Sequence, residues 1–437
     1  MRFRTELLGD HIALRKGLSY KGEYLVEESS LGLVGLDAFV AGGGYKPGAE
    51  KPYSGAFKPD HLVESGDVLL AMTEQQDGLL ASPLVVPENL GGYEELVLSH
   101  HVAKVVAKSG RLRPEFVFNF LRVPINRARA AYGNTGTTVQ DLPYDVIYEQ
   151  MIPVPSIEEQ DRINSFIAVL DHKIELNNAI AVNVERIAQS IFRSWFLDFD
   201  PVKAKMAGEK PAGMDDVTAA LFSDSMEDSE LGPIPRGWRV GTVGEICSVL
   251  VNGSTPSRSN SSFWDASEVS WFKTGELSDG FLLESKESIS ESALTGSNVK
   301  ILPKGGVLMA IYAAPTVGRL GILTHDSTFN QACTGMLARK EYGLPFLFLH
   351  LKNRRNWFNS FAIGAAQQNI SKSIVEKCPV VISSEDIHEA FLATAGPLFA
   401  EIECLTRQSE ELANLRDALL PRLISGELQI PEEMLDS

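Results

Sequence analysis

The sequence predicts an α+β protein in which two mixed α/β globules are separated by two long antiparallel coiled-coil helices, with a pseudo-twofold internal duplication. One observation is a heptad pattern of apolar residues that occurs twice, each time after a globular stretch. A second is that one shift of 228 residues superimposes the two patterns, aligning Ile174 with Ile402 and Val184 with Leu412. A third is that about 150 residues with short apolar runs and many glycines precede each pattern.

The first globule is predicted at residues 1–155 and the second at residues 233–382. A turn followed by a buried strand is expected at residues 66–72, and residues 305–311 repeat the same pattern of glycine and apolar residues. The other predicted elements are short, namely strands at residues 84–86, 102–106 and 321–324 and helices at residues 116–121 and 345–351.

Each globule leads into a long helix, which we expect at residues 156–200 and 383–428. Ser156 with Glu159 forms a capping-box pattern, and Ser383 with Asp386 forms a weaker version of it. Because each apolar stripe is narrow, we expect the helices to pack against each other, and packing of each helix on its own globule is the alternative. The predicted helix-pair contacts are Ile167, Leu170, Ile174, Ala181, Val184, Ile191, Trp195, Ile402, Leu405, Leu412, Leu415 and Leu419.

The formal net charge of −17 is distributed unevenly along the chain. Residues 201–232 are interpreted as an exposed acidic linker, since seven acids and one lysine lie between Gly208 and Leu231. Residues 429–437 are expected to form a tail. By contrast, residues 104–129 carry seven basic residues against one acid, and a shorter basic cluster at Lys352, Arg354 and Arg355 occupies the matching place in the second copy. Matching basic clusters favour contact with a polyanion, and solvated helix faces are the simpler alternative.

Composition and cysteine spacing exclude several classes of protein. No apolar run approaches the roughly 18 residues of a membrane span, and residues 1–6 lack the apolar core of a signal peptide, so we expect a cytoplasmic protein. The four cysteines, at positions 247, 333, 378 and 404, have no Cys-x-x-Cys spacing, which argues against a zinc site and a disulfide framework.

Motifs that carry catalysis are missing from the sequence. There is no Walker-type phosphate loop and no His-Glu-x-x-His, and Asp200-Pro201 lacks the second proline and the aromatic residue of an amino-methyltransferase loop. His100 and His101 are adjacent, so we expect them to point to opposite faces of a strand and not to share a ligand. We therefore predict no catalytic residue and no metal site.

Polar loops in both copies instead carry side chains suited to base edges and phosphates. Amides address adenine, arginine addresses guanine, and hydroxyl groups are versatile, although any surface loop is also polar. In the first copy the candidate DNA contacts are Thr73, Gln75, Gln76, Lys104, Arg111, Arg113, Arg127, Arg129, Asn134, Thr137, Thr138 and Gln140. In the second copy they are Asn252, Ser254, Thr255, Ser257, Arg258, Arg319, Arg354, Arg355, Gln367, Gln368 and Asn369.

Several strings, in order along the whole chain, resemble the specificity subunits of type I restriction-modification systems. They are IFRSWFLDFDPVKAKMAGEKPAGM from residue 191, ELGPIPRGWRV from residue 230, NGSTPS from residue 252 and LLPRLISGEL from residue 419. One departure lies at Leu8-Gly9-Asp10, where the first globule begins without the Ile-Pro-x-x-Trp lead-in seen at residues 234–238.

The resemblance implies two target recognition domains, here residues 1–155 and 233–382, that each read one half of a split double-stranded DNA sequence. It also implies that the helices fix the spacer and dock two methyltransferase (M) subunits, which use S-adenosylmethionine for DNA methylation. Restriction/translocase (R) subunits would bind ATP and Mg. This chain itself is expected to bind no cofactor, to hold no active site and to contact no membrane. The rival interpretations are a structural adaptor with protein partners only and a self-contained nuclease or methyltransferase.

Overall fold

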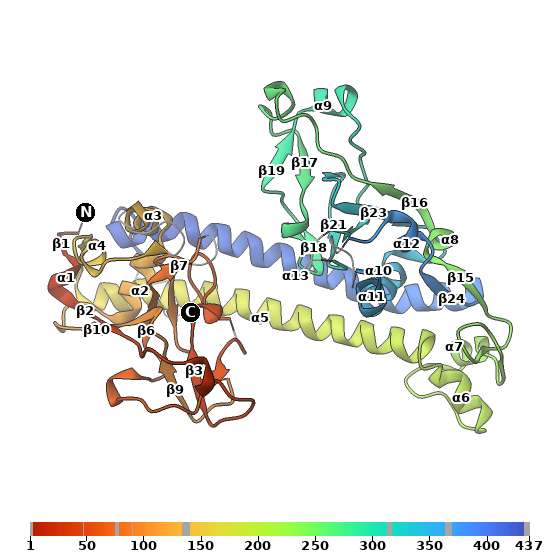
Figure 1. Cartoon of the computed structure of the whole chain (residues 1–437), viewed down its shortest axis with the longest axis horizontal. Helices are drawn as coiled ribbons and strands as arrows, with labels where there is room; N and C mark the ends of the chain where they lie inside the picture. Colours follow the sequence, from red (N-terminus) through yellow and green to blue (C-terminus); the bar gives the residue numbers. More distant parts are fainter. Residues whose placement is uncertain are drawn as a thin grey trace. The chain divides into compact units, whose positions relative to one another are not determined.

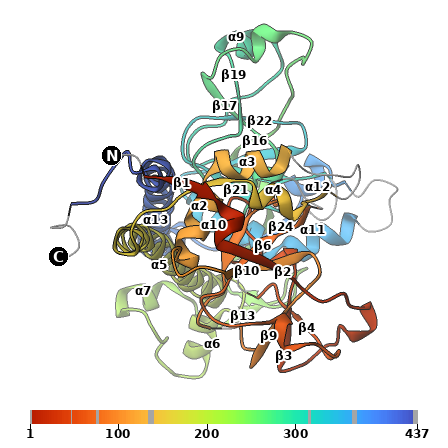
Figure 2. The same ribbon diagram turned by 90° about the vertical axis from the view of Figure 1, so that its left-hand side faces the viewer.

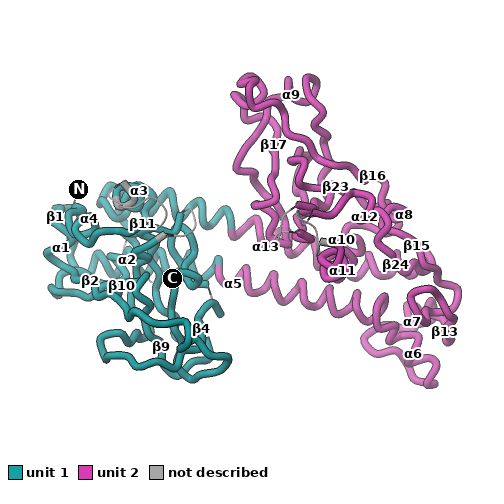
Figure 3. The backbone as a smooth tube through the Cα atoms, viewed as in Figure 1, with its two compact units in different colours: residues 1–174, 410–437 teal, residues 175–409 magenta. Residues whose placement is uncertain are grey.

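The structure, a computed structural model, describes residues 3–46, 48–74, 78–89, 91–132, 140–312, 317–362 and 369–431 (Figure 1). The chain forms two compact units, one of residues 1–174 with 410–437 and the other of residues 175–409 (Figure 3). Each unit therefore holds one globule together with parts of both long helices.

The two long helices are α5 (Ile157–Phe196) and α13 (Glu385–Ser425), close to the predicted bounds. The hydroxyl of Ser156 accepts a hydrogen bond from the backbone N–H of Glu159 at 3.2 Å, which confirms the predicted cap. The predicted cap at Ser383 is wrong. The Ser383 hydroxyl donates to the carbonyl of Ser384 at 3.3 Å, and the helix begins at Glu385.

Within each unit the helices run antiparallel. In the first unit, Ile163 and Ile167 of α5 share a buried cluster with Leu420, Leu423 and Ile424 of α13. In the second unit, the Asn177 amide donates to Gln408 at 3.4 Å, and further along α5 the ring of Phe192 lies 6.0 Å from that of Phe391. The predicted fold class, with two α+β globules and a pair of long antiparallel helices, is confirmed.

One predicted helix-pair contact does not fit the structure. Leu415 is 47% exposed, whereas Ile167, Trp195 and Leu405 are buried. The seam of α13 continues in alternating steps of three and four through Ser409 and Arg416, so Leu415 lies one residue out of register. The other predicted contacts are half-buried, namely Leu170, Ile174, Ala181, Val184, Ile191, Ile402, Leu412 and Leu419.

The first globule is built on a four-stranded antiparallel sheet in the order β2-β10-β6-β8. Its strands are β2 (Ile12–Lys16), β10 (Val102–Ala107), β6 (Val68–Ala71) and β8 (Pro83–Val85). Four helices lie around this sheet, namely α1 (Leu8–His11), α2 (Pro114–Arg122), α3 (Pro124–Tyr132) and α4 (Tyr144–Tyr148). The antiparallel pair of β1 (Thr5–Leu7) and β12 (Met151–Pro153) completes this part of the globule. A second sheet has the order β4-β3-β9-β5, with β4 (Lys51–Pro52), β3 (Leu31–Val34), β9 (Glu95–Leu98) and β5 (Leu62–Val63). In two views, α3 and α4 lie above the main sheet and β3 and β9 lie below it (Figure 1, Figure 2).

The second globule repeats this plan. Its main sheet has the order β16-β23-β20-β21-β18, with β16 (Cys247–Asn252), β23 (Cys333–Ala338), β20 (Val307–Ala310), β21 (Leu320–Leu323) and β18 (Gly280–Leu282). The matching outer elements are α8 (Val243–Ile246), α10 (Gly343–Asn353), α11 (Arg355–Ala362), α12 (Lys372–Glu376) and the pair β15 (Arg239–Thr242) and β24 (Pro379–Ile382). The peripheral part differs, with a three-stranded sheet of β19 (Glu287–Ile289), β17 (Val269–Phe272) and β22 (Thr328–Phe329) beside α9 (Glu291–Gly296).

Two glycines mark the same backbone crossing in both copies. The N–H of Gly17, after β2, donates to Val102 at 3.0 Å, and the N–H of Gly253, after β16, donates to Cys333 at 3.0 Å. A Cβ on Gly17 would lie 2.3 Å from the Ser99 carbonyl oxygen, and one on Gly253 would lie 2.1 Å from that of Asn330. Only glycine fits such a close approach, so the duplication extends to the backbone itself.

The predicted exposed linker is wrong in part. Residues 201–232 contain α7 (Asp216–Leu221) and most of α6 (Asp200–Met206), and Val202 and Phe222 are buried in the same cluster as Trp195 and Trp238. The seven acids between Gly208 and Leu231 are exposed. The prediction failed because it relied on the acidic composition, whereas a few apolar residues pack this segment against the rest of the second unit.

Candidate nucleic-acid interface

Polar side chains gather at one end of the main sheet of the first globule. Thr73, in the two-stranded ladder β7 (Thr73–Glu74) with β11 (Gln140–Asp141), lies 2.8 Å from the ring of His101 through its hydroxyl. The rings of His100 and His101 lie 3.8 Å apart, and that of Tyr20 lies 6.0 Å from that of His100. These residues come from the chain just beyond β2, just beyond β6 and just before β10, so one edge of the sheet assembles them.

The prediction that His100 and His101 point to opposite faces of a strand is wrong. They lie in the turn before β10, not within a strand, and their rings face each other. Burial lowers the pKa of both imidazoles, and each pKa is lowered further by a neighbour, that of His100 by Lys16 and that of His101 by His100, while Asp141 opposes both shifts. Neutral imidazoles present one donor and one acceptor each, which suits hydrogen bonding to a base edge.

The same edge of the second globule carries different side chains. The Thr334 hydroxyl of β23 donates to the Asn252 side chain of β16 at 3.0 Å, and the Thr255 hydroxyl donates to the side chain of Gln331. Asn252 and Gln331 are exposed. Gln331 and Thr334 were not among the predicted residues. They can be found by matching the strands of the two main sheets in order. This match aligns the start of β23 with the turn before β10 that carries the two histidines.

Arg258 is held on an aromatic surface next to this edge. Its guanidinium lies 3.6 Å from the ring centroid of Trp264 and 5.1 Å from that of Trp271, and it forms an ion pair with Glu287 at 2.6 Å. Lys273 and then Arg258 hold the pKa of the Glu287 carboxyl below its usual range, against burial. The side chain of Arg258 is still 53% exposed, so the stack presents a preoriented cation to the surface.

Several predicted cations already have acidic partners within the chain. Arg111 binds Glu6 through two hydrogen bonds of 2.8 and 3.0 Å, and Arg113 binds Asp161 through two of 2.9 and 3.1 Å. Lys104 pairs with Asp67, and Arg355 pairs with Asp279. Exposed pairs are weak, so a phosphate can compete for Arg111 and Arg113. Their positions are nevertheless determined by the fold, and the net positive charge of the basic cluster is smaller than the sequence suggested.

The other predicted residues fall into three groups. Arg129 is exposed on α3, Arg127 is half-buried there with a pKa lowered by burial, and Arg319 and Arg354 are half-buried. Ser254, Ser257 and Asn369 lie beside the second edge, where the hydroxyl of Ser257 meets that of Ser259 at 2.8 Å, and Gln140 pairs through its backbone with Glu74. The remaining predictions lie outside the described residues, namely Gln75, Gln76, Asn134, Thr137, Thr138, Gln367 and Gln368.

Two observations on the described residues bear on metal binding and thiol chemistry. Among them no group of three or more His, Cys, Asp or Glu side chains is arranged to hold a metal ion. Burial raises the pKa of the Cys247 and Cys378 thiols to about 12, and it also raises that of Cys333, so these thiols are poor nucleophiles. Over the same part of the chain, no helix combines the length and apolar character needed to cross a membrane.

Comparison with known proteins gives one consistent result. The family model described as "Type I restriction modification DNA specificity domain" matches residues 66–186 and 235–402. The specificity subunit of the type I restriction enzyme HindI from Haemophilus influenzae is 25% identical over 414 residues, covering 84% of this chain and 87% of that protein. That of MjaIX from Methanocaldococcus jannaschii is 26% identical over 311 residues, covering 68% of this chain and 65% of that protein.

A solved structure shares the fold. The crystal structure of the type I restriction-modification S subunit from M. genitalium aligns with a TM-score of 0.54 at 12% identity. The alignment covers 97% of this chain and 96% of that one.

Proposed function

The chain belongs to the family of type I restriction-modification DNA specificity proteins, and from this membership we propose that each globule reads one half of a bipartite DNA target. The protein is a specificity subunit, whose task is DNA sequence recognition. The two halves are read at the matching sheet edges, one in each globule.

The observation that carries this proposal is the contrast between the two edges. The main sheets share one strand plan, including the close backbone approach at Gly17 and at Gly253. The side chains differ, since His100, His101 and Thr73 line one edge and Asn252, Thr255 and Gln331 line the other. Equal scaffolds with different hydrogen-bonding groups are what two readers of different half-sites require.

We further propose that the long helices set the distance between the half-sites. The α5 helix has 40 residues and α13 has 41, so each is about 60 Å long at 1.5 Å per residue. That length corresponds to one to two turns of B-DNA, at about 34 Å per turn.

The exposed faces of the helices are proposed to dock two methyltransferase subunits, and restriction/translocase subunits would join that assembly. The chain itself would be non-catalytic. S-adenosylmethionine, ATP and Mg would be bound by the partners, because the sequence lacks their binding motifs.

Domain exchange tests the two-reader model. Residues 1–155 are replaced by the corresponding domain of another family member, and methylated adenines are mapped across a genome with and without the chimaera. We expect one half-site to change while the other half-site and the spacer persist. A change in both halves contradicts the model, and so does a change in neither.

A second measurement addresses the rival interpretations. The assembled complex should bind DNA with an affinity that falls steeply as salt increases, because phosphate contacts release counterions. Salt-independent or absent binding favours a protein-only adaptor. Cleavage or methyl transfer by the purified chain alone favours an enzyme.

A further inference from the structure

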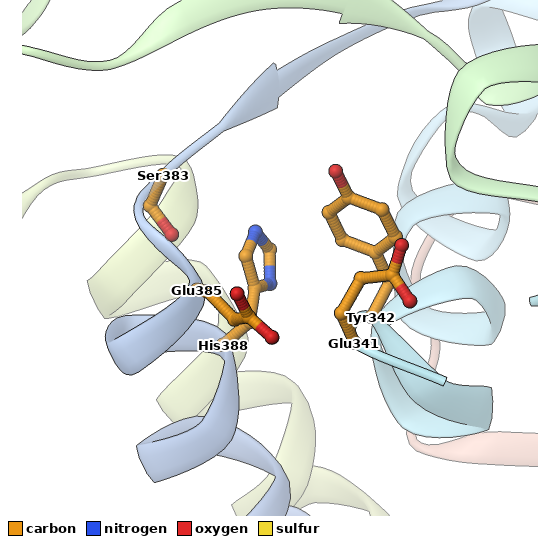
Figure 4. A pocket seen from close by; sticks show the side chains of 5 residues that line it. All are labelled: Glu341, Tyr342, Ser383, Glu385 and His388. Atoms are coloured by element: carbon orange, nitrogen blue, oxygen red, sulfur yellow. The ribbon is translucent and has the colours of Figure 1, made fainter. Parts of the chain in front are cut away.

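The second unit contains a cavity of about 420 Å³ at the start of α13. Glu341 and Tyr342, just before α10, form one wall, and Ser383, Glu385 and His388 form the other (Figure 4). Every one of these side chains carries a polar group, so the cavity suits a polar or charged ligand. None of the five is among the residues assigned to DNA reading or to the helix seam.

His388 lines the cavity and has no hydrogen-bond partner among the described residues. The residue is 1% exposed, and within the described part of the chain neither ring nitrogen makes a hydrogen bond. Aromatic rings fix its position, since Phe196 stacks on it at 5.4 Å and Tyr342 and Phe346 meet it edge-on at 4.8 and 4.6 Å. A buried polar group of this kind is normally satisfied, so the imidazole is an open site for a ligand.

The first copy of the duplication meets the same need internally. Gln160 lies 228 residues before His388, at the equivalent point of α5. Its amide nitrogen donates to the carbonyls of Arg111 and Pro155 at 2.8 and 3.0 Å, and its oxygen accepts from the N–H of Arg113 at 2.8 Å. In the first copy, the Gln160 amide therefore links the start of α2 to α5 through hydrogen bonds. In the second copy, the imidazole at the equivalent position has no hydrogen-bond partner among the described residues and faces a cavity.

The charge of the cavity favours a cationic ligand. Glu341 and Glu385 are exposed at its mouth, and the described structure gives neither an ion pair. Burial lowers the pKa of His388 to about 4, so the imidazole is neutral near pH 7 and can accept a hydrogen bond. Two cations lie close to Tyr342, but Arg239 pairs with Glu245 at 2.7 Å and Arg339 donates to the Glu245 carbonyl at 2.8 Å.

We propose that this cavity binds the guanidinium group of an arginine side chain presented by a protein partner. A guanidinium is flat and carries five N–H donors, so it can meet both carboxylates and the neutral imidazole together. The ring of Tyr342 offers an aromatic surface for stacking. A side chain of a polypeptide fits better than free arginine, because the α-carboxylate of the amino acid would face Glu341 and Glu385. The proposal does not depend on which DNA sequence the chain reads.

The test uses the full chain and N-acetyl-L-arginine amide as the probe, with the neutral citrulline analogue as control. Labelling histidine Cε1 gives signals from eight histidines, and His388→Gln identifies the signal of His388. We expect the His388 signal to shift on titration with a Kd of about 1 mM, as is typical for a fragment of this size. The citrulline analogue should bind at least tenfold more weakly. No shift at ten times that concentration, or equal binding of citrulline, overturns the proposal.

Variants locate the site, with saturation transfer from protein to probe as the readout. We expect Glu341→Gln together with Glu385→Gln to weaken binding at least fivefold and His388→Gln to remove it. Glu389→Gln, an exposed carboxylate one residue beyond His388, should leave binding unchanged. Near-ultraviolet circular dichroism checks that each variant is folded. If Glu389→Gln weakens binding as much as the cavity variants do, the site is not this cavity.

A third arm separates the two sources of a guanidinium. Free L-arginine should bind several-fold more weakly than the capped amide because of its α-carboxylate. Equal or tighter binding of L-arginine would assign the cavity to a metabolite and overturn the protein-partner assignment.

Discussion

Asp171 of α5 accepts a hydrogen bond from the guanidinium of Arg416 of α13 at 2.8 Å. The other oxygen of the same carboxylate accepts from Arg122 of α2, also at 2.8 Å. Arg122 is almost completely buried, and burial lowers its pKa despite the nearby carboxylate. One carboxylate therefore joins both long helices to the globule of the first unit.

Asp171→Asn should destabilise the first unit strongly. The neutral amide would leave Arg122 buried without its counter-charge, and losing one partner of a buried pair costs about 3–5 kcal/mol. The partial exposure of Asp171, with 27% of its side chain accessible, reduces the expected loss to about 2–3 kcal/mol. Urea unfolding of the purified chain measures it. Asp417→Asn, which removes the 53%-exposed partner of Arg416, is the matched control and should cost less than about 1 kcal/mol.

The same pair shows how far sequence could predict the helix seam. Apolar spacing correctly gave α5 and α13, and every predicted seam residue except Leu415 is buried or half-buried, because a 3.5-residue repeat is a local property of the chain. It failed at Leu415, since the register places Arg416 at the seam. That arginine is neutralised there by the adjacent Asp417 and by Asp171, which is 245 residues away in sequence. Pairing between distant charges has no local pattern.

The candidate interface was less predictable than the fold. Polar loop residues such as Thr73, Thr255 and Asn252 could be chosen because they follow buried strands. His100, His101 and Gln331 were missed, because they join the edge only through the antiparallel pairing of β10 and β23 with their neighbours. Gly17 follows β2 and Gly253 follows β16, so aligning these two glycines aligns the two sheet edges.

Gly253→Ala should destabilise the second unit. The new methyl carbon would lie 2.1 Å from the backbone oxygen of Asn330, and backbone atoms at a strand crossing move only at a cost. We expect a loss of about 1–3 kcal/mol, as for other overpacked sites. Thermal unfolding measures the change. Gly275→Ala, whose added carbon meets nothing within 4 Å, is the control. Equal effects from both variants would mean that the crossing is not tight.

Acidification should destabilise the second unit through two buried histidines. Burial lowers the pKa of His388 to about 4 and that of His350 to about 3, from an ordinary value of 6.5. The unfolded chain therefore binds more protons between these values, so their contribution to stability is complete above pH 6.5 and is lost as the pH falls. At pH 5 each histidine should cost about 2 kcal/mol relative to pH 7.

Unfolding in urea at pH 7 and pH 5 measures this dependence. His388→Gln should reduce the pH effect by about half of the two-histidine total, because it removes one of the two groups. The exposed His172 is the control, and His172→Gln should leave the dependence unchanged. A pH dependence that persists in full without His388 and His350 would assign acid sensitivity to other groups.

Variants at base contacts and at phosphate contacts should affect the DNA affinity of the assembled complex in different ways. Gln331→Ala removes an exposed amide at the second edge, and we expect weaker binding to the cognate site by about 1–3 kcal/mol, with an unchanged salt slope. Arg129→Gln removes an exposed cation of α3, so it should weaken cognate and random DNA alike and lower the slope of log K against log salt by about 0.9. Fluorescence anisotropy at several salt concentrations measures both. The interface assignment is wrong if Gln331→Ala weakens binding to both DNAs equally.

A stripe of exposed apolar residues on α5 should carry methyltransferase docking. Leu176, Ile180 and Ile187 are 44%, 36% and 52% exposed, and their spacing of four and seven residues places them on one face of the helix. Exposed aliphatic groups in such a row are costly in water unless a partner covers them. Replacing all three with serine should weaken assembly with the methyltransferase subunit by at least tenfold, measured by sedimentation of the mixed subunits. Val217→Ser, at a 78%-exposed position on α7, is the control that should leave assembly intact.

Because the stripe lies outside the seam marked by Asn177 and Gln408, the triple variant should keep its unfolding midpoint. Loss of assembly with an unchanged midpoint therefore identifies a docking surface, whereas full assembly of the triple variant would place the methyltransferase on another face of the helices.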